Sequence, residues 1–191
     1  MTEAPTISGD RPIGPGRLVL VVGPSGAGKD TLLGLARAPC EGSGIVFARR
    51  AVTREASAFE DNEQMSHDAF QQARMRGDFA VHWEAHGHGY GLRRVIDDDI
   101  GAGRTVVANV SRTVVETMRR GYADVTVVSV IAPPEILAER LAGRARGSDG
   151  LVADRLSRVV DDAAITPDVT INNVGDVQHR ARELVQVIRG S

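Results

Sequence analysis

The residue types and spacing of a phosphate-binding loop, or P-loop, occur near the start of the sequence, at Gly23-Pro24-Ser25-Gly26-Ala27-Gly28-Lys29-Asp30. The segment fits G-x-x-x-x-G-K-[ST] at every fixed position except the last. Its glycines let the backbone curl so that N–H groups point at phosphate oxygens, and the N-terminal end of the following helix adds a positive potential. Lys29 is expected to reach the β- and γ-phosphates. The segment therefore predicts ATP binding through Gly23, Pro24, Ser25, Gly26, Ala27, Gly28, Lys29, Asp30 and Thr31.

The last position of the motif holds Asp30 instead of the usual Ser or Thr, whose hydroxyl contacts Mg²⁺. A carboxylate in the first turn of a helix is compatible with the helix dipole, and it can reach Mg²⁺ directly or through a water molecule. Thr31 is not a simple substitute, because a helix turns by about 100° per residue and Thr31 points elsewhere. We therefore expect Mg²⁺ to be the cofactor and Asp30 to be its protein ligand.

Motifs of two other classes of P-loop protein are missing. A GTPase switch needs a D-x-x-G after a strand and an N-K-x-D, and the sequence has neither. A motor ATPase usually ends a strand with an Asp that holds magnesium. The strand predicted at 105–110 ends Ala108-Asn109-Val110, without a carboxylate.

Arginines are concentrated after the helix that Pro133-Pro134 opens. One interpretation is a solvated basic face, since exposed arginines are common. The other is a lid, over about residues 140–155, that closes over a transferring phosphoryl group and neutralises its charge. Glycines at 143, 147 and 150 favour the lid. The arginines concerned are Arg140, Arg144, Arg146, Arg155 and Arg158.

The abundance of arginine without an obvious Asp base favours a kinase whose acceptor is itself a phosphate. Such an oxygen is already ionised near neutral pH, so no general base has to deprotonate it. The main obstacle is repulsion between two phosphates, which arginines and magnesium offset.

Strands and helices alternate along the chain, which predicts a parallel sheet covered on both faces, an α/β fold in three layers. Ligands bind such sheets at the carboxyl ends of the strands, and the P-loop follows the apolar strand at 18–22. A helix is expected from Lys29 to Arg37, stopped by Pro39. Further strands are expected at 45–48, 79–83, 105–110, 125–131 and 169–171, and further helices at 67–75, 93–100, 111–120, 135–141, 151–164 and 177–188.

A chain of 191 residues predicts one domain. We expect a flexible N-terminal arm over residues 1–16 and a single kinase domain over 17–191. Residues 50–91 carry no strong period and are expected to form an insertion that binds the acceptor, with a glycine-rich turn at 86–91.

The composition limits which binding partners and which cellular location are expected. The formal net charge of -2 argues against a nucleic-acid partner, and no apolar run approaches the roughly 20 residues that span a membrane. Cys40 is the single cysteine, so no internal disulfide forms. The first 16 residues lack the features of a signal peptide. These features indicate a cytoplasmic protein that binds small molecules, and they leave monomer and homodimer open.

Seven motifs are spread over the chain: GPSGAGKD, Val52-Thr53-Arg54 with Glu60, Phe79-Ala80-Val81-His82-Trp83, Gly87-His88-Gly89-Tyr90-Gly91, Ala132-Pro133-Pro134, Arg140 to Arg144, and Asn109-Val110-Ser111-Arg112. With these motifs the chain, from about residue 17 to 189, resembles the guanylate-kinase-like P-loop kinases, and within them the ribose 1,5-bisphosphate phosphokinase family. The motif at 109–112 is the most discriminating, because guanylate kinases have guanine-binding carboxylates at the corresponding positions.

The resemblance implies transfer of the ATP γ-phosphoryl group to the 1-phosphate of α-D-ribose 1,5-bisphosphate, a reaction that serves phosphonate breakdown and yields 5-phosphoribosyl 1-diphosphate. It implies catalytic roles for Lys29, Arg140, Arg144 and Arg155. It implies acceptor contacts from Arg54, Glu60, Tyr90, Asn109, Ser111 and Arg112. Arg54 is followed by Glu55-Ala56, where related kinases have a proline and, nearby, a second phosphate-binding arginine. The number of arginines on the acceptor phosphates is therefore open.

Two alternatives remain at this point. One is a guanylate kinase or another nucleoside-monophosphate kinase, which Asn109, Ser111 and Val81 disfavour. The other is a catalytically inactive guanylate-kinase-like binding module, which tends to lose the loop lysine that this chain keeps as Lys29. Three histidines at 82, 86 and 88 are weak signs of a metal site, because no carboxylate or cysteine lies at ligand spacing.

Overall fold

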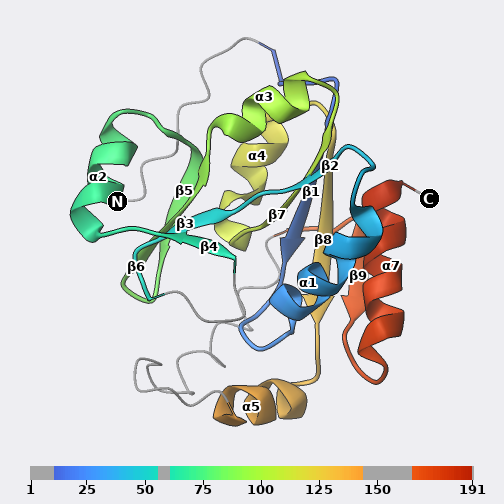
Figure 1. Ribbon diagram of the computed structural model, residues 1–191. Helices are drawn as coiled ribbons and strands as arrows, with labels where there is room; N and C mark the ends of the chain where they lie inside the picture. The colour runs from blue at the N-terminus through green and yellow to red at the C-terminus, as the bar shows by residue number, and fades with distance from the viewer. Residues whose placement is uncertain (1–10, 56–60, 144–164, 191) are drawn as a thin grey trace.

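The computed structural model describes residues 11–55, 61–143 and 165–190 (Figure 1). Its centre is a five-stranded sheet in the order β2-β7-β1-β8-β9. All four strand pairs in it are parallel. The strands are β1 (Arg17–Val22), β2 (Ile45–Phe47), β7 (Thr105–Asn109), β8 (Val125–Ile131) and β9 (Val169–Asn172).

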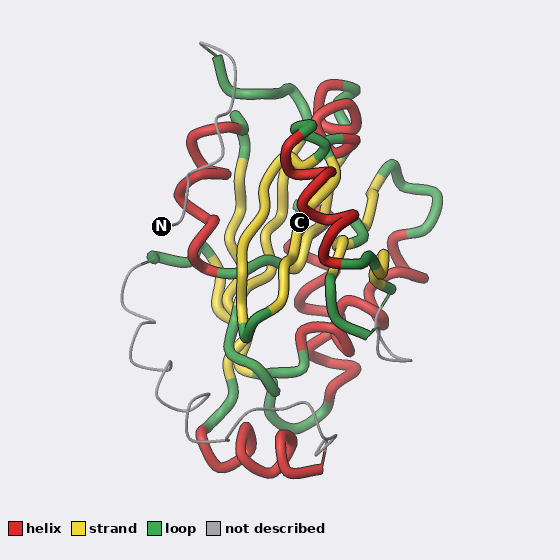
Figure 2. Tube along the Cα trace, turned by 90° about the vertical axis from the view of Figure 1, so that its left-hand side faces the viewer, coloured by secondary structure: helices red, strands yellow, loops and turns green. Residues whose placement is uncertain are grey.

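Helices cover both faces of this sheet, so its middle strands are apolar on both sides (Figure 2). On one face, α1 (Lys29–Cys40) and α7 (Val177–Arg189) pack against Val19 and Val21. On the other face, α3 (Val95–Gly101) and α4 (Val115–Gly121) pack against Leu18 and Leu20. The predicted three-layer α/β fold with a mostly parallel sheet is thus confirmed.

The segment that carried no strong period folds into a second sheet with the strand order β4-β3-β6-β5. The pair β3–β4 is parallel, and the other two pairs are antiparallel. Helix α2 (His67–Met75), capped by Ser66, covers one face of it. The strands are β3 (Arg50–Val52), β4 (Asn62–Gln64), β5 (Phe79–Ala85) and β6 (His88–Arg93).

The predicted glycine-rich turn at 86–91 is wrong beyond Gly87, because residues 88–93 form β6. Gly89 and Gly91 are there for space: a Cβ on either would come within 2.8 Å of the ring of Phe70 or Phe79. The turn itself is His86-Gly87, and both residues have positive φ.

Other boundaries also differ from expectation. Pro39 lies inside α1, one residue before its end. Ser111 caps the 3-10 turn η1 (Arg112–Val114), and α4 begins only at Val115. The helix expected at 151–164 lies outside the described residues, whereas α5 (Pro134–Gly143) is present.

The predicted N-terminal arm is not loose over residues 11–16. Ile13 N–H donates to the Gly121 carbonyl at 2.8 Å, and Gly16 N–H donates to the Ile100 carbonyl at 2.9 Å. Within the described ranges, none of the helices combines the length and apolar character that crossing a bilayer requires.

Candidate active site

A cleft lies where the P-loop and the end of β7 face the second sheet. The P-loop connects β1 to α1, so it stands at the carboxyl end of a parallel strand, where α/β folds bind ligands. The residues that line the cleft are Gly23, Ser25, Gly26, Gly28, Lys29, Asp30, Arg50, Arg54, Trp83, Ala85, His86, Tyr90, Asn109, Val110 and Ser111.

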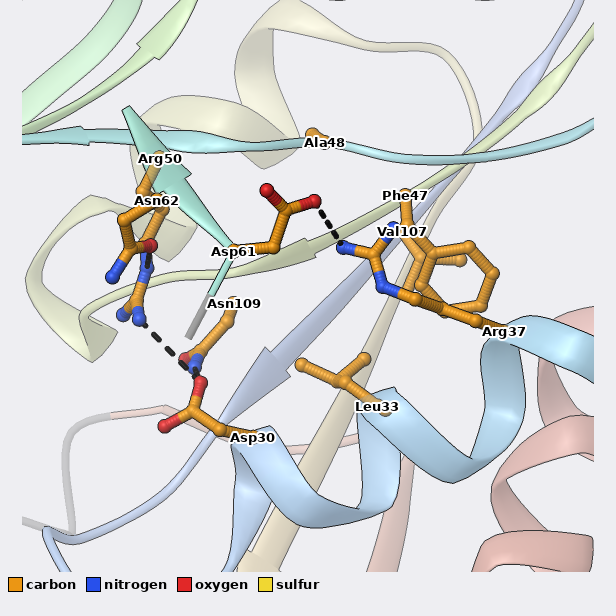
Figure 3. Close-up of a pocket in the computed structure, with 11 residues that line it drawn as sticks. Asp30, Leu33, Arg37, Phe47, Ala48, Arg50, Asp61, Asn62, Val107 and Asn109 are labelled. Atoms are coloured by element: carbon orange, nitrogen blue, oxygen red, sulfur yellow. Dashed lines mark hydrogen bonds and ion pairs between the residues drawn. The ribbon is translucent and has the colours of Figure 1, made fainter. Parts of the chain in front are cut away.

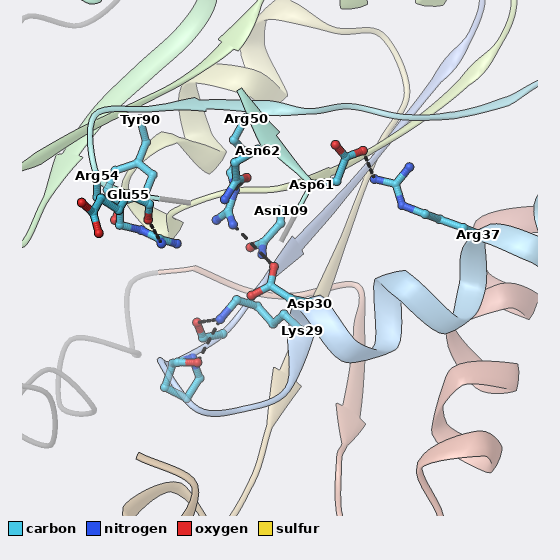
Figure 4. Close-up of polar contacts among 12 residues, drawn as sticks. Lys29, Asp30, Arg37, Arg50, Arg54, Glu55, Asp61, Asn62, Tyr90 and Asn109 are labelled. Carbon is cyan, nitrogen blue, oxygen red and sulfur yellow. Dashed lines mark hydrogen bonds and ion pairs between the residues drawn. The ribbon is translucent and has the colours of Figure 1, made fainter. Parts of the chain in front are cut away.

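The glycines of the P-loop are required by both conformation and space. Gly23 has φ 146°, and a Cβ there would come within 2.1 Å of the Val130 carbonyl oxygen. Gly28 has φ 87°, and a Cβ there would come within 2.3 Å of Asn173 Nδ2. Lys29 Nζ donates to the carbonyls of Gly23 at 2.7 Å and Pro24 at 2.9 Å, which holds the ammonium group over the loop (Figure 4).

The Arg140 side chain donates hydrogen bonds to carbonyl oxygens of the P-loop. Its Nη1 donates to Gly26 and Ala27, both at 3.4 Å, and its Nη2 donates to the Asn173 carbonyl at 3.1 Å. Asn173, 3% exposed, donates from Nδ2 to the Ala27 carbonyl at 2.7 Å. Arg140 is not among the described residues that line the cleft, so its role at the transferring phosphoryl group stays a prediction. Arg144 and Arg155 lie outside the described residues.

Asp30 lies in the first turn of α1 and connects three elements. Its Oδ1 accepts a hydrogen bond from Asn109 Nδ2 at 2.8 Å, at the end of β7. The same oxygen contacts Arg50 Nη2 at 3.4 Å, at the start of β3 (Figure 3). The structure thus places Asn109, which we expected at the acceptor, against the predicted metal ligand.

Arg54 and Tyr90, both predicted to contact the acceptor, lie together on the wall of the cleft opposite the P-loop. Arg54 Nε donates to the Tyr90 hydroxyl at 3.3 Å. The Tyr90 ring is stacked on Trp83, with ring centroids 5.7 Å apart and an interplanar angle of 8°. Arg50 lies over the same ring, with Cζ 6.0 Å from its centroid. Tyr90 therefore contacts two guanidinium groups, one at its hydroxyl and one over its ring.

The remaining predicted acceptor residues differ in their placement. Ser111 lines the cleft, but its Oγ also accepts from Thr113 N–H at 3.4 Å, as the cap of η1. Arg112 follows it and is not among the described lining residues, and burial lowers the pKa of its guanidinium. Glu60 lies outside the described residues.

Sequence reasoning missed Arg50 and His86 as lining residues. Arg50 lies in the segment without a clear period, so only the pairing of β3 with its neighbours shows where its side chain points. His86 has φ 53°, which gives it a place in the hairpin turn that no periodic pattern reveals.

A second pocket adjoins the first, and Asp30, Arg50 and Asn109 line both (Figure 3). Its other walls include Leu33, Arg37, Phe47, Ala48, Asp61, Asn62 and Val107. The glycines of the P-loop and Lys29 are not among its described lining residues, so the cleft at the P-loop is the candidate active site.

Comparison with known proteins gives close relatives over nearly the whole chain, although no family model matches it. The chain is 62% identical over 178 residues to the ribose 1,5-bisphosphate phosphokinases of Bradyrhizobium diazoefficiens and Rhodopseudomonas palustris, covering 93% of this chain and 90% of each relative. It is 49% identical over 176 residues to that of Methylobacterium radiotolerans, covering 92% of this chain and 98% of the relative.

Solved structures agree on the fold. Guanylate kinase from Anaplasma phagocytophilum superposes with a TM-score of 0.64 at 22% identity, over 92% of this chain and 85% of that one. A sugar kinase from Janibacter superposes with a TM-score of 0.51 at 20% identity, over 91% and 92%. The predicted guanylate-kinase-like architecture is therefore confirmed.

Proposed function

The chain belongs to the ribose 1,5-bisphosphate phosphokinase family, and on that premise we propose that it transfers the γ-phosphoryl group of ATP to the 1-phosphate of α-D-ribose 1,5-bisphosphate. The products are ADP and 5-phosphoribosyl 1-diphosphate. The family is one of kinases, which favours this function over an inactive binding module, and its relatives' names favour a sugar phosphate over a nucleotide as acceptor.

The observation that carries the proposal is the pair of anion-binding walls that face each other across one cleft. One wall holds the P-loop with Lys29, and the other holds Arg50 and Arg54. Asp30 is the one carboxylate among the described residues that line the cleft. A phosphate monoester carries a charge of about -1.5 to -2 at pH 7. A cleft with more cationic than anionic side chains therefore suits two phosphorylated substrates bound together.

The reaction needs no general base from the protein. The second pKa of a phosphate monoester is about 6, so the attacking oxygen of the 1-phosphate is largely ionised at neutral pH. The carboxylate of Asp30 is held by Asn109 and Arg50, and the proposed reaction does not require it to act as a base. Positioning and charge neutralisation by Lys29 and the arginines then supply the catalysis, as in other phosphoryl transfers.

Phosphoryl transfer of this kind generally uses a divalent metal, and we propose Mg²⁺ here. The Asp30 carboxylate fits the role, since it follows Lys29 directly and lines the same cleft as the loop glycines. It would hold the metal directly or through a water molecule. A divalent metal held there would supply charge neutralisation to the phosphoryl transfer.

The acceptor wall suits a sugar phosphate better than guanine. Asn109 and Ser111 carry an amide and a hydroxyl, so neither supplies a carboxylate that would accept protons from a guanine edge. The Asn109 amide is also bound to Asp30, and Ser111 caps η1. We assign the second sheet, within residues 50–91, to the acceptor. We assign residues 140–155, with Arg144 and Arg155, to a lid over the transferring group. We place this activity in the cytoplasm, without a nucleic-acid or membrane partner.

A coupled ADP-release assay tests the proposal, with ribose 1,5-bisphosphate, GMP, AMP and ribose 5-phosphate as separate acceptors. We expect turnover with ribose 1,5-bisphosphate. Turnover of GMP in its place would make the protein a nucleotide kinase. Tight ATP binding without turnover of any acceptor would make it a binding module.

A further inference from the structure

Arg50 occupies a rigid position in the second sheet, facing the P-loop. Its backbone pairs with Asn62 of β4 on one side and Leu92 of β6 on the other, so β3 is an interior strand. The preceding Arg49 extends to a different environment, where its half-exposed side chain pairs with Asp61 at 2.7 Å. Successive residues near a strand point to opposite sides, so Arg50 is the one of the two that enters the cleft.

The Arg50 side chain is held on three sides. Its Nε contacts Asn62 Oδ1 at 3.3 Å, its Nη2 contacts Asp30 Oδ1 at 3.4 Å, and its Cζ lies 6.0 Å from the centroid of the Tyr90 ring. The side chain is 13% exposed. Among the residues that the structure describes, none accepts a hydrogen bond from Nη1. The guanidinium is therefore fixed in place and keeps donor capacity for an anion in the cleft.

Another arginine of the same sheet shows what a fully paired guanidinium looks like in this fold. Arg93 binds Glu63 through two hydrogen bonds, from Nε at 3.0 Å and from Nη2 at 2.6 Å. Arg50 makes one longer contact with Asp30, whose Oδ1 it shares with Asn109. The charge of Arg50 is thus only partly matched within the described protein, which distinguishes a ligand-binding arginine from a structural one.

Arg50 also lies at the right point along the cleft. Figure 4 shows its guanidinium between the Asp30 and Lys29 end on one side and the Arg54 and Tyr90 end on the other. The γ-phosphoryl group is transferred at the Lys29 end. A pentose with a phosphate at each end needs two cationic positions, and this one cleft holds the guanidinium groups of Arg50 and Arg54, which contact Tyr90 at its ring and at its hydroxyl.

We propose that Arg50 binds the attacking 1-phosphate of the acceptor and that Arg54, with the Tyr90 hydroxyl, binds the 5-phosphate. The assignment rests on the proposed function, because it takes ribose 1,5-bisphosphate as the acceptor. It supplies the second acceptor arginine that the sequence after Arg54 lacks, from the strand that precedes it. Specificity for a bisphosphate follows, since each phosphate has its own arginine.

The competing role for Arg50 is to position Asp30 alone. In that case loss of the guanidinium would change the Mg²⁺ and ATP dependence, as loss of Asp30 would. Contact with the 1-phosphate predicts a different result, in which the KM for the acceptor changes and the KM for ATP does not.

The first experiment measures steady-state kinetics of Arg50→Gln, with Arg49→Gln as the matched control. A charge-assisted hydrogen bond to phosphate predicts a rise of about 10- to 100-fold in the acceptor KM of Arg50→Gln. The KM for ATP and the Mg²⁺ dependence should stay within about twofold, and Arg49→Gln should match the wild type. Arg50→Lys keeps the charge and should recover part of the loss. An equal effect on ATP or Mg²⁺ would overturn the proposal in favour of the positioning role.

The second experiment separates the two phosphates, using ribose 1-phosphate and ribose 5-phosphate as competitive inhibitors. Arg50→Gln should weaken inhibition by ribose 1-phosphate at least about 10-fold and spare ribose 5-phosphate, while Arg54→Gln should do the reverse. Equal weakening of both inhibitors by either variant would overturn the assignment. Failure of the wild type to phosphorylate ribose 1,5-bisphosphate would refute the proposed function. Normal wild-type turnover with an unaffected Arg50→Gln would refute only the role of Arg50.

Discussion

Replacing Asp30 with Asn tests the metal role of the unusual P-loop residue most directly. The substitution keeps the size of the side chain and an oxygen that can accept from Asn109 Nδ2, whose bond to Asp30 is 2.8 Å long. It removes the negative charge, which only a carboxylate contributes to the metal. Asp30→Ala removes both the negative charge and the oxygen that accepts from Asn109. Comparing the two variants therefore separates the loss of charge from the loss of the hydrogen bond.

The structure sets the size of each effect. A carboxylate that acts on a metal through a water molecule is expected to contribute about 10- to 100-fold in metal affinity. Asp30→Asn removes the whole charge of the carboxylate, so we expect its loss of metal affinity to fall within that range. Asn109 is 7% exposed, and its unpartnered amide in Asp30→Ala should cost about 1–3 kcal/mol of stability. For a domain of this size that corresponds to a melting temperature lower by about 2–12 °C.

The assay measures initial rates against free Mg²⁺ at saturating ATP and acceptor, with thermal unfolding of each variant alongside. Asp61→Asn is the matched control, because Asp61 forms an exposed ion pair with Arg37 at 3.3 Å and lines only the neighbouring pocket. We expect its Mg²⁺ dependence to match the wild type. If Asp30→Asn has the wild-type Mg²⁺ dependence and normal turnover, Asp30 has no metal role and the reasoning fails.

Three further predictions follow from the geometry. Gly28→Ala should abolish ATP binding in a calorimetric titration, because its Cβ would meet the buried amide of Asn173 at 2.3 Å in a positive-φ backbone; retained affinity would contradict the loop geometry. His86→Asn should raise the free energy of unfolding in urea by about 0.5–1 kcal/mol, because Asn-Gly suits a two-residue hairpin turn with positive φ better than His-Gly; a less stable variant would speak against that turn. Hydrogen bonds from Arg93 hold the pKa of Glu63 below its usual 4.5, so the stabilisation is present above that pH and is lost as pH falls through the lowered value. Glu63→Gln should therefore have a lower melting temperature than the wild type at pH 7, and this difference in melting temperature should disappear at acidic pH. A difference that does not depend on pH would refute the ion-pair explanation.

Much of the fold could be predicted from local patterns. The apolar runs at 18–22 and 125–131 predicted buried parallel strands, and both are present as β1 and β8. The P-loop was evident because its glycines and Lys29 act within a few residues of each other. The family was predicted from motifs spread over the chain, and the relatives confirm it.

In the second sheet, local patterns predicted α2 and β5 but missed β3, β4 and β6. Gly89 and Gly91 resemble turn residues in sequence, and they are strand residues here because two aromatic rings need the space that side chains would fill. Periodicity cannot reveal a glycine whose purpose is to accommodate a ring from another element. The three-residue strands β3 and β4 are also too short to show an alternation.

The sequence by itself determined that a P-loop follows a buried strand and that its last position carries a carboxylate, because that geometry depends on neighbours in the chain. Only the tertiary structure decided what Asp30 touches. Asn109 lies 79 positions away in sequence and Arg50 lies 20 away, and the three meet because β7 is adjacent to β1 and the second sheet faces the P-loop. The contacts of Arg140 with the Gly26 and Ala27 carbonyls of the loop likewise come from the tertiary structure. Contacts of this kind depend on how sheets and helices pack, and residue spacing along the chain does not encode that packing.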